Sequence, residues 1–272
     1  MKQFTVIGNN VSLSKSPELF TYIFNRLNID ADYSYTQIAD FKELTQFFNT
    51  LSSMNYSGIN ITIPFKEKIA NYCNIKSDIV KITGSSNCIG IRDNELYAHN
   101  TDSYGFNNLL KMNNINLNDL SIIVLGSGGS ARSIIYSLLF LNVKEIFILS
   151  RNKKTSKEII KFFSNMNNIP IKLYNSSKSC KNNVLINCTP IGVNEDIELQ
   201  ILDFIDIAKY CIDINYINNK LAKSIFSKYT DYYISGLDMF IFQALASLDI
   251  WFSEKLSEKL NYKELVKIIK NE

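Results

Sequence analysis

The chain has 272 residues, of which 46% are hydrophobic, and a formal net charge of +3. This length favours two domains, and only ten glycines and four prolines occur, which excludes a linker-rich or disordered protein. The lysines are scattered, with no basic stripe, so we expect no nucleic-acid partner. The N-terminal MKQFTVIGNN lacks the apolar stretch of a signal peptide, and no run of about 18 apolar residues predicts a membrane span. We therefore expect a cytoplasmic protein that does not associate with membranes.

The cysteines and the histidine argue against a metal site. The five cysteines are widely spaced and include no C-x-x-C pair, which indicates reduced thiols rather than disulfides or zinc ligands. Cys88, Cys188 and Cys211 lie in apolar runs, so we expect them to be buried as small hydrophobic residues. His99 is the single histidine, and we expect it at a surface or a hairpin end.

The first sixty residues alternate predicted strands and helices. We expect strands over 4–7 and 31–38, and helices over 18–27 and 41–51. Ser14 and Ser16 lie in the polar loop before the first helix. Ser16 is the expected N-cap, and Pro17 is suited to the first helical turn.

A third strand ends in polar residues. Ile59, Ile61 and Ile63 alternate with Asn60 and Thr62, the pattern of a half-buried strand, and Pro64 ends it. Asn60, Thr62 and Lys66 can therefore cluster at its carboxyl end, where α/β sheets place ligands. The alternative for Lys66 is a solvated lysine in a first helical turn.

The next stretch predicts a turn and strand over 82–91, a hairpin at 92–94, and a strand over 95–98. Residues 106–110 are apolar and should be helical. Asp102 fits the first turn of that helix, with Thr101 or Asn100 as its cap. The alternative for Asp102 is a capping role alone.

A glycine turn separates a predicted strand over 121–125 from a helical pattern over 133–140. The turn reads Gly126-Ser127-Gly128-Gly129-Ser130-Ala131. Gly126 permits a sharp turn, Gly128 lets a phosphate approach the backbone, and Ala131 lets the helix pack closely on the strand. The helix N-terminus favours an anion. We interpret this as a dinucleotide site. The alternative is a tight turn that binds nothing.

The following predicted strand, 145–149, ends in Ser150-Arg151-Asn152-Lys153-Lys154. An NAD-selective protein usually has an acidic residue here, which would repel the 2′-phosphate of NADP. Arginine binds that phosphate through a fork of donors. We therefore expect NADP, held chiefly by Arg151 and also by Ser150 and Lys154. The alternative is a solvated basic turn before a helix that starts near Thr155.

The remaining elements complete two α/β domains. Further strands are predicted over 171–174, 184–188, 210–216 and 231–235, and helices over 221–228, within 239–260, and over 262–270. We expect residues 1–101, completed by 237–272, to form a substrate-binding domain, and 102–236 to form a doubly wound, six-stranded Rossmann-type domain. The C-terminal helices would return to the first domain with Gln243. Thr189 and Gly236 are further candidates for cofactor binding, although Thr189 and Asn187 could instead satisfy local backbone.

Taken in order, the polar motifs resemble those of shikimate dehydrogenases. The resemblance covers nearly the whole chain. The motifs are Ser14-Lys-Ser16-Pro17, Asn60-Ile-Thr62-Ile-Pro64-Phe-Lys66, Ser86-Asn87, Asn100-Thr-Asp102, the glycine turn, Ser150-Arg151, Asn187-Cys-Thr189-Pro-Ile-Gly192, Asp213-Ile-Asn-Tyr216, and Gly236-Leu-Asp-Met239 with Gln243-Ala244.

The resemblance implies an NADP-linked, reversible reduction of 3-dehydroshikimate to shikimate in aromatic biosynthesis. It implies that Lys66 and Asp102 form the catalytic pair. A lysine can donate the proton that the reduced carbonyl needs, and a carboxylate keeps that lysine charged and oriented. The positions that match substrate-binding residues are Ser14, Ser16, Thr62, Asn87, Tyr216 and Gln243.

The chain departs from the family pattern at a few positions, namely Asn10, Leu13, His99, Asn218 and Leu221. None of these removes a group that the chemistry needs. Two alternatives stay open: a quinate/shikimate dehydrogenase that uses NAD or NADP, and a non-catalytic NADP-binding regulator on the same scaffold. Retention of Lys66 and Asp102 argues against the regulator. Either a monomer or a homodimer is expected.

Overall fold

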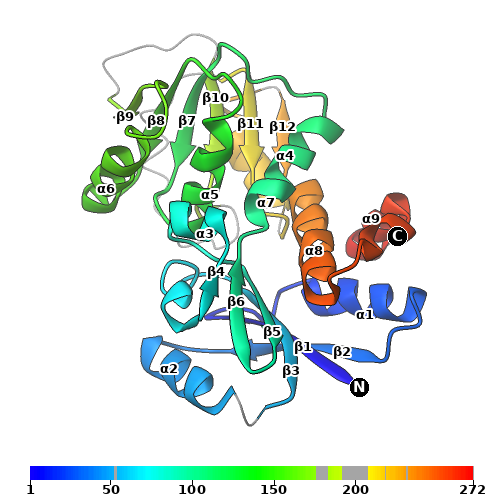
Figure 1. Cartoon of the computed structure of the whole chain (residues 1–272). Helices are drawn as coiled ribbons and strands as arrows, with labels where there is room; N and C mark the ends of the chain where they lie inside the picture. Colours follow the sequence, from blue (N-terminus) through cyan, green and yellow to red (C-terminus); the bar gives the residue numbers. More distant parts are fainter. Residues whose placement is uncertain (52–53, 176–182, 192–207, 218, 231, 272) are drawn as a thin grey trace. The chain divides into compact units, whose positions relative to one another are not determined.

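A computed structural model describes residues 1–51, 54–175, 183–191, 208–217, 219–230 and 232–271 (Figure 1). Cys180, Gly192 and Asn218 lie outside the described residues. The described chain divides into unit 1, Met1–Gly105 with Ile241–Glu272, and unit 2, Phe106–Phe240. The division points fall within two helices, α4 (Asp102–Met112) and α8 (Leu237–Phe252). Asp102 therefore belongs to unit 1, although the sequence analysis placed it at the start of the second domain.

The described residues of unit 1 form a six-stranded mixed sheet. Its strands are β1 (Lys2–Gly8), β2 (Ala31–Gln37), β3 (Tyr56–Ile61), β4 (Ile75–Lys76), β5 (Cys88–Arg92) and β6 (Glu95–His99). They lie in the order β2-β1-β3-β5-β6-β4. β1 runs parallel to both β2 and β3, whereas β5 is antiparallel to β3 and β6. The β5–β6 hairpin turns at Asp93 and Asn94, which both adopt the positive φ angles that a tight hairpin requires.

Helices cover both faces of this sheet. They are α1 (Ser16–Arg26), α2 (Phe41–Thr50), the 3-10 turn η2 (Ile69–Tyr72), α3 (Asp78–Thr83), most of α8, the 3-10 turn η4 (Leu256–Lys259) and α9 (Tyr262–Lys270). Leu44 and Phe47 of α2 pack with Ile59 and Ile61 on one face. Aromatic rings fill the other face, where Phe4, Phe20, Phe24, Tyr33 and Trp251 contact one another.

Burial on both faces corrects the expectation of a half-buried third strand. Residues 58–61 are all buried, because α8 covers the face that Asn60 shares with Gly58. A Cβ on Gly58 would overlap the Trp251 indole, whose Nε1 donates to Ile89 O at 2.9 Å. The polar residue at position 60 thus marks internal hydrogen bonding rather than solvent, because Asn60 donates to Asn87 O and to Ser247 Oγ.

Two local expectations near the ends of elements are wrong. Helix α1 begins at Ser16 itself, so Lys15 is the N-cap residue, and the Ser14 hydroxyl accepts from Ser16 N at 3.3 Å. Strand β3 ends at Ile61, and Ile63 is 55% exposed rather than aligned with the buried isoleucines. Helix α1 thus begins earlier than its pattern indicates, whereas the apolar alternation of β3 runs two residues beyond the end of the strand.

The described residues of unit 2 form a fully parallel, six-stranded sheet. Its strands are β7 (Ser121–Leu125), β8 (Glu145–Leu149), β9 (Ile171–Leu173), β10 (Asn183–Asn187), β11 (Tyr210–Asp213) and β12 (Tyr233–Ser235). Their order is β12-β11-β10-β7-β8-β9. Numbered from β7, this is the 3-2-1-4-5-6 order of a Rossmann sheet, which confirms the predicted fold class. The strand order reverses between β7 and β10, the point at which such sheets bind ligands.

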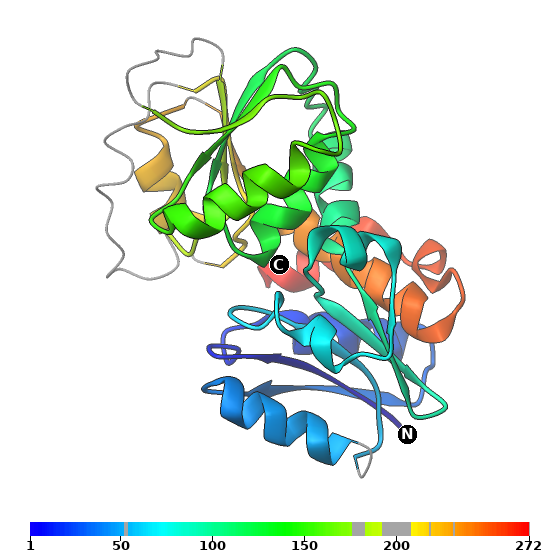
Figure 2. The same ribbon diagram turned by 60° about the vertical axis from the view of Figure 1, so that its left-hand side comes forward.

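Helices α5 (Gly129–Leu138), α6 (Lys153–Phe163) and α7 (Asn219–Phe226) pack on the unit 2 sheet. Right-handed crossovers that proceed in opposite directions from β7 place α5 and α6 on one face and α7 on the other (Figure 2). Ala222 and Phe226 of α7 pack with Ile123, Leu125 and Leu185. In the described part of the chain, no helix is both long enough and apolar enough to span a membrane.

Candidate active site

Lys66 and Asp102 form a close ion pair in unit 1. Lys66 Nζ lies 2.7 Å from Asp102 Oδ2, and the two side chains are only 13% and 4% exposed. Lys66 lies in the turns after β3, and Asp102 is the first residue of α4, 36 positions later in the chain. The pair is shielded from water, so the lysine and the carboxylate interact more strongly than a surface pair would.

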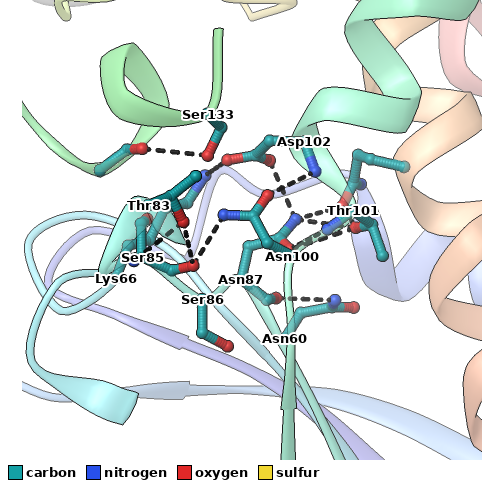
Figure 3. A network of polar contacts seen from close by, with 12 residues as sticks. Asn60, Lys66, Thr83, Ser85, Ser86, Asn87, Asn100, Thr101, Asp102 and Ser133 are labelled. Atoms are coloured by element: carbon teal, nitrogen blue, oxygen red, sulfur yellow. Dashed lines mark hydrogen bonds and ion pairs between the residues drawn. The ribbon is translucent and has the colours of Figure 1, made fainter. Parts of the chain in front are cut away.

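Asn87 Nδ2 donates to the other oxygen of Asp102, as Figure 3 shows. It lies 2.9 Å from both Asp102 Oδ1 and Thr101 Oγ1, and 3.2 Å from Gln243 Oε1. Asn87 Oδ1 accepts from Thr101 N at 2.7 Å. The side chain of Asn100 accepts from Asp102 N at 3.1 Å, at the start of α4. Each carboxylate oxygen of Asp102 thus has a donor, which fixes the direction in which the carboxylate faces Lys66.

Behind Asn87 lies a buried layer of polar side chains. Asn60 Nδ2 donates to Asn87 O and to Ser247 Oγ, both at 3.1 Å, and Tyr33 OH donates to Asn60 Oδ1 at 2.8 Å. We call Asn60, Asn87, Thr101, Asp102, Gln243 and Ser247 the Asn87 network. Because buried polar groups that lose a partner are costly, this network favours one arrangement of the Lys66–Asp102 pair.

The network includes residues that the sequence analysis did not assign to the site. Asn60 was grouped with Lys66 but its partners are Tyr33, Asn87 and Ser247. Ser247 follows Gln243 by one helical turn, and its hydroxyl donates to Gln243 O at 2.9 Å. That i, i+4 spacing was the available signal, since it places both side chains on one helix face.

The remaining expected substrate-binding residues have other neighbours. Ser14 Oγ donates to Ser16 Oγ at 3.2 Å, which places the two hydroxyls together at the start of α1. Thr62 N donates to Ile7 O at 2.9 Å, one residue after β3. Tyr216 belongs to unit 2, where its ring stacks on that of Phe240 with centroids 3.9 Å apart.

The glycine turn of unit 2 has the geometry expected of a phosphate site. Gly126 has φ +103°, a conformation that side chains rarely adopt. Gly128 is the N-cap of α5 and supplies no side-chain cap, and Ala131 is fully buried where the helix meets the sheet. The Ser130 and Gly129 backbone lies in the first turn of α5. These residues fit a dinucleotide phosphate at the helix N-terminus.

The basic turn lies beside the glycine turn. Ser127 Oγ and Ser150 Oγ are 2.8 Å apart, which links the carboxyl ends of β7 and β8. Arg151 and Lys154 follow Ser150 and are both exposed. Asn152 caps α6 by accepting from Thr155 N at 3.0 Å. With Lys153, three exposed cations therefore lie at the strand end where the ribose of a dinucleotide binds in this fold.

A buried carboxylate, Asp213, organises the carboxyl ends of β10 and β11. It is 0% exposed and accepts from Asn187 Nδ2 at 2.9 Å and from Tyr233 OH at 2.9 Å. Burial raises the pKa of Asp213 to about 6, and the hydrogen bonds from Asn215, Tyr233 and Asn187 partly offset that rise. Asn187 Oδ1 in turn accepts from Thr189 N and Thr189 Oγ1, at 3.0 and 2.6 Å. Asn187 and Thr189 therefore do bond to local backbone, which is the alternative to cofactor binding that the sequence left open.

Gly236 also has a local reason to be glycine. A Cβ there would overlap the backbone of Ile214, and Gly236 O accepts from Phe240 N at 2.8 Å at the start of α8. These contacts explain the residue without a cofactor, and its place among the cofactor-binding residues stays a prediction.

Cys88, Cys211 and His99 lie in strands, and Cys188 follows one. Cys88 and Cys211 are buried, as expected, and burial raises the pKa of Cys88 to about 12. Cys188 is only half-buried, contrary to expectation, because the chain leaves the sheet at Asn187. His99 ends β6, and burial lowers its pKa. Among the described residues, no three His, Cys, Asp or Glu side chains are grouped to hold a metal ion.

A family model and a full-length relative match this chain. The model of the shikimate dehydrogenase substrate binding domain matches residues 6–89. A shikimate dehydrogenase (NADP(+)) from Clostridium beijerinckii is 31% identical over 281 residues, covering 100% of this chain and 99% of the relative.

Solved structures share the fold. Shikimate dehydrogenase from Aquifex aeolicus has a TM-score of 0.82 and 26% identity, covering 100% of this chain and 97% of that one. Shikimate 5-dehydrogenase from Listeria monocytogenes, in complex with shikimate and NAD, has a TM-score of 0.79 and 21% identity, covering 100% and 96%. With the full-length relative, these matches show that the chain belongs to the shikimate dehydrogenase family.

Proposed function

We propose that this protein catalyses the reversible, NADP-linked reduction of 3-dehydroshikimate to shikimate, a step in aromatic amino acid and chorismate biosynthesis. The observation that carries the proposal is the shielded Lys66–Asp102 pair, 2.7 Å apart, in a chain of the shikimate dehydrogenase family. Such a pair suits a reaction in which a ketone oxygen gains negative charge and then a proton.

The two units divide the work in this proposal. Unit 1 holds the catalytic pair and all of the expected substrate-binding residues except Tyr216, which belongs to unit 2. Unit 2 holds NADP through Gly126–Ala131, with Ser150, Arg151 and Lys154 around the 2′-phosphate, and with Thr189 and Gly236 beyond them. This assignment is supported by the Rossmann strand order, by the absence of a side-chain cap at the N-terminus of α5, and by the three cations after β8. When bound, the reduced cofactor supplies a hydride.

Lys66 donates the proton in the reduction and accepts it in the reverse reaction. As the substrate carbonyl carbon receives the hydride, the C=O π-bond electrons move to oxygen, and Lys66 Nζ donates a proton to that oxygen. In the reverse direction the neutral amine of Lys66 takes the proton from the hydroxyl. Asp102 orients Lys66 and stabilises its charged form, and Asn87 orients Asp102 through Oδ1. Residues of this kind contribute roughly 10²–10⁴-fold to such rates.

Neutral polar side chains hold the substrate. We assign the carboxylate of the substrate to the paired hydroxyls of Ser14 and Ser16, which lie together at the start of α1. The ring hydroxyls fall to Thr62, Asn87, Gln243 and Tyr216. Asn87 and Gln243 already contact each other at 3.2 Å, so one hydroxyl could bridge both.

We propose that the enzyme works in the cytoplasm, and that it is a monomer or a homodimer. The four cysteines in the described part of the chain are free thiols, which fits a reducing compartment.

The direct experiment mixes purified protein with shikimate and NADP and follows the absorbance of reduced nicotinamide. Parallel reactions replace shikimate with quinate and NADP with NAD. The proposal predicts turnover with shikimate and NADP, and lower kcat/KM with NAD. Comparable turnover of quinate with either cofactor would instead support a quinate/shikimate dehydrogenase. Cofactor binding without any turnover would support a regulator.

A further inference from the structure

Asp213 lies in unit 2 and belongs to none of the groups assigned above to substrate or proton transfer. It is the last residue of β11, beside β10 in the sheet, with Asn187 paired opposite it. Its two oxygens have different partners. Oδ1 accepts from Asn187 Nδ2 at 2.9 Å and from Asn215 N and Nδ2 at 3.1 and 2.8 Å. Oδ2 accepts from Tyr233 OH at 2.9 Å.

The two side-chain amides that donate to Oδ1, those of Asn187 and Asn215, also bind the segment after β10. Asn187 Oδ1 accepts from Thr189 N at 3.0 Å and from Thr189 Oγ1 at 2.6 Å, and its Nδ2 also donates to Ile191 O at 3.3 Å. Asn215 Nδ2 donates to Thr189 O at 2.8 Å. The N–H, the hydroxyl and the carbonyl of Thr189 are therefore all held by amides that Asp213 orients.

The held segment borders the glycine turn. A Cβ on Gly126 would lie 3.1 Å from Thr189 Cγ2 and 3.2 Å from Cys188 O, so the 188–189 backbone closes one side of that turn. Cys188 N also donates to Leu125 O at 2.9 Å. A shift of Thr189 would thus change the space beside the turn that receives the cofactor phosphates.

We propose that Asp213 is a positioning residue for the cofactor, which sets the Cys188–Ile191 segment against Gly126 through Asn187 and Asn215. The inference rests on the proposed function, since it takes the ligand of unit 2 to be NADP. It requires an acceptor at the Oδ1 position and does not require the negative charge. The Tyr233 contact, on the other oxygen, contributes to folding but not to cofactor affinity.

The test measures the Kd of NADP by titration calorimetry for the full-length protein and variants, with thermal unfolding measured alongside. Asp213→Ala removes the acceptor and should raise the Kd of NADP at least tenfold, with the Kd of shikimate changed less than twofold. Asp213→Asn keeps an acceptor for Asn187 and Asn215 and should stay within about threefold of wild type. Tyr233→Phe is the matched control and should leave the Kd of NADP within twofold while lowering the Tm.

Asn215→Ala keeps the test decisive if Asp213→Ala does not fold. Asn215 is only partly buried, and its loss removes the Nδ2 donor to Thr189 O and to Asp213 Oδ1 but leaves Asp213 bonded to Asn187, so we expect a threefold or larger rise in the Kd of NADP. Unchanged NADP affinity in folded Asp213→Ala or Asn215→Ala overturns the inference. So does an equal loss in Asp213→Asn and Asp213→Ala, or an equal loss in Tyr233→Phe. A wild-type protein that binds no NADP would refute the proposed function itself, before any variant is compared.

Discussion

Two buried aspartates, Asp102 and Asp213, differ in the groups that surround their carboxylates, and this difference determines the role that each can have. In Asp102, a lysine ammonium occupies one oxygen and an amide the other, so the carboxylate is paired with a positive charge. Around Asp213, by contrast, the hydrogen-bond donors to the carboxylate are side-chain amides, a backbone N–H and a phenol, all of them neutral. Asp102 is therefore suited to keep Lys66 charged and oriented for proton transfer, whereas Asp213 is suited to hold the neighbouring backbone in place.

The buried position of Asp213 predicts an unusual pH dependence of stability. Its pKa rises from 3.8 to about 6, so between about pH 4 and pH 6 the folded state binds more protons at this site than the unfolded state. The contribution of Asp213 to the free energy of unfolding therefore falls as the pH rises through that window. A pKa difference of about two units between the folded and unfolded states lowers the free energy of unfolding by about 3 kcal/mol across this window. The neighbouring Tyr233 and Cys211 do not titrate there, since the pKa of each is raised.

This prediction is checked by denaturant unfolding of the wild type and Asp213→Asn from pH 4 to pH 7. Because the variant lacks the titrating carboxyl group, the difference between the two unfolding free energies isolates it. Wild type should lose about 3 kcal/mol relative to the variant across this range. A constant difference, or one that changes in the opposite direction, would contradict the burial argument.

At the scale of elements, the candidate residues concentrate where strands end. Lys66 follows β3, the glycine turn follows β7, Arg151 follows β8, and Thr189 follows β10. Carboxyl ends of parallel strands meet at one edge of each sheet, so residues that are distant in sequence become neighbours there. The 2.8 Å contact between Ser127 and Ser150 is an example, because it joins two such ends.

The turn between β8 and α6 carries the prediction for cofactor choice. Arg151→Ala removes a charged donor from the 2′-phosphate, so we expect KM for NADP to rise about tenfold to a hundredfold, and KM for NAD to change little. Steady-state kinetics with both cofactors measure this. Lys144→Ala is the control, since Lys144 is an exposed cation just before the opposite end of β8. An equal change in KM for NADP and for NAD in Arg151→Ala would show that Arg151 does not bind the 2′-phosphate.

Elements with a regular pattern were predictable, and short or composite ones were not. The strands over 121–125 and 145–149 are confirmed residue by residue, because continuous apolar runs between turn signals leave little choice. No element was expected where β4 and α3 lie, since two and six residues are too few to show a period. The N-cap of α1 was misplaced by one residue, an error typical of helix ends.

At the scale of the whole chain, the fold was predictable but the partners within the site were less so. The Rossmann order follows from the glycine turn and the repeat of strands and helices. By contrast, Asn60 meets Ser247 across 187 positions, and Trp251 donates to Ile89 across 162. No local pattern encodes such pairs, because they depend on how α8 packs on the unit 1 sheet. Family resemblance named Lys66, Asp102, Asn87 and Gln243, and the structure adds the bonds that join them.

The most direct measurement is a comparison of turnover and substrate affinity in Lys66→Ala. With shikimate and NADP, kcat should fall about 10²–10⁴-fold, since the proton carrier is lost. The Kd of shikimate, measured by calorimetry, should change less than about threefold, and Lys68→Ala, an exposed neighbour, should match wild type in both. A folded Lys66→Ala protein that keeps kcat within about threefold of wild type would contradict the account.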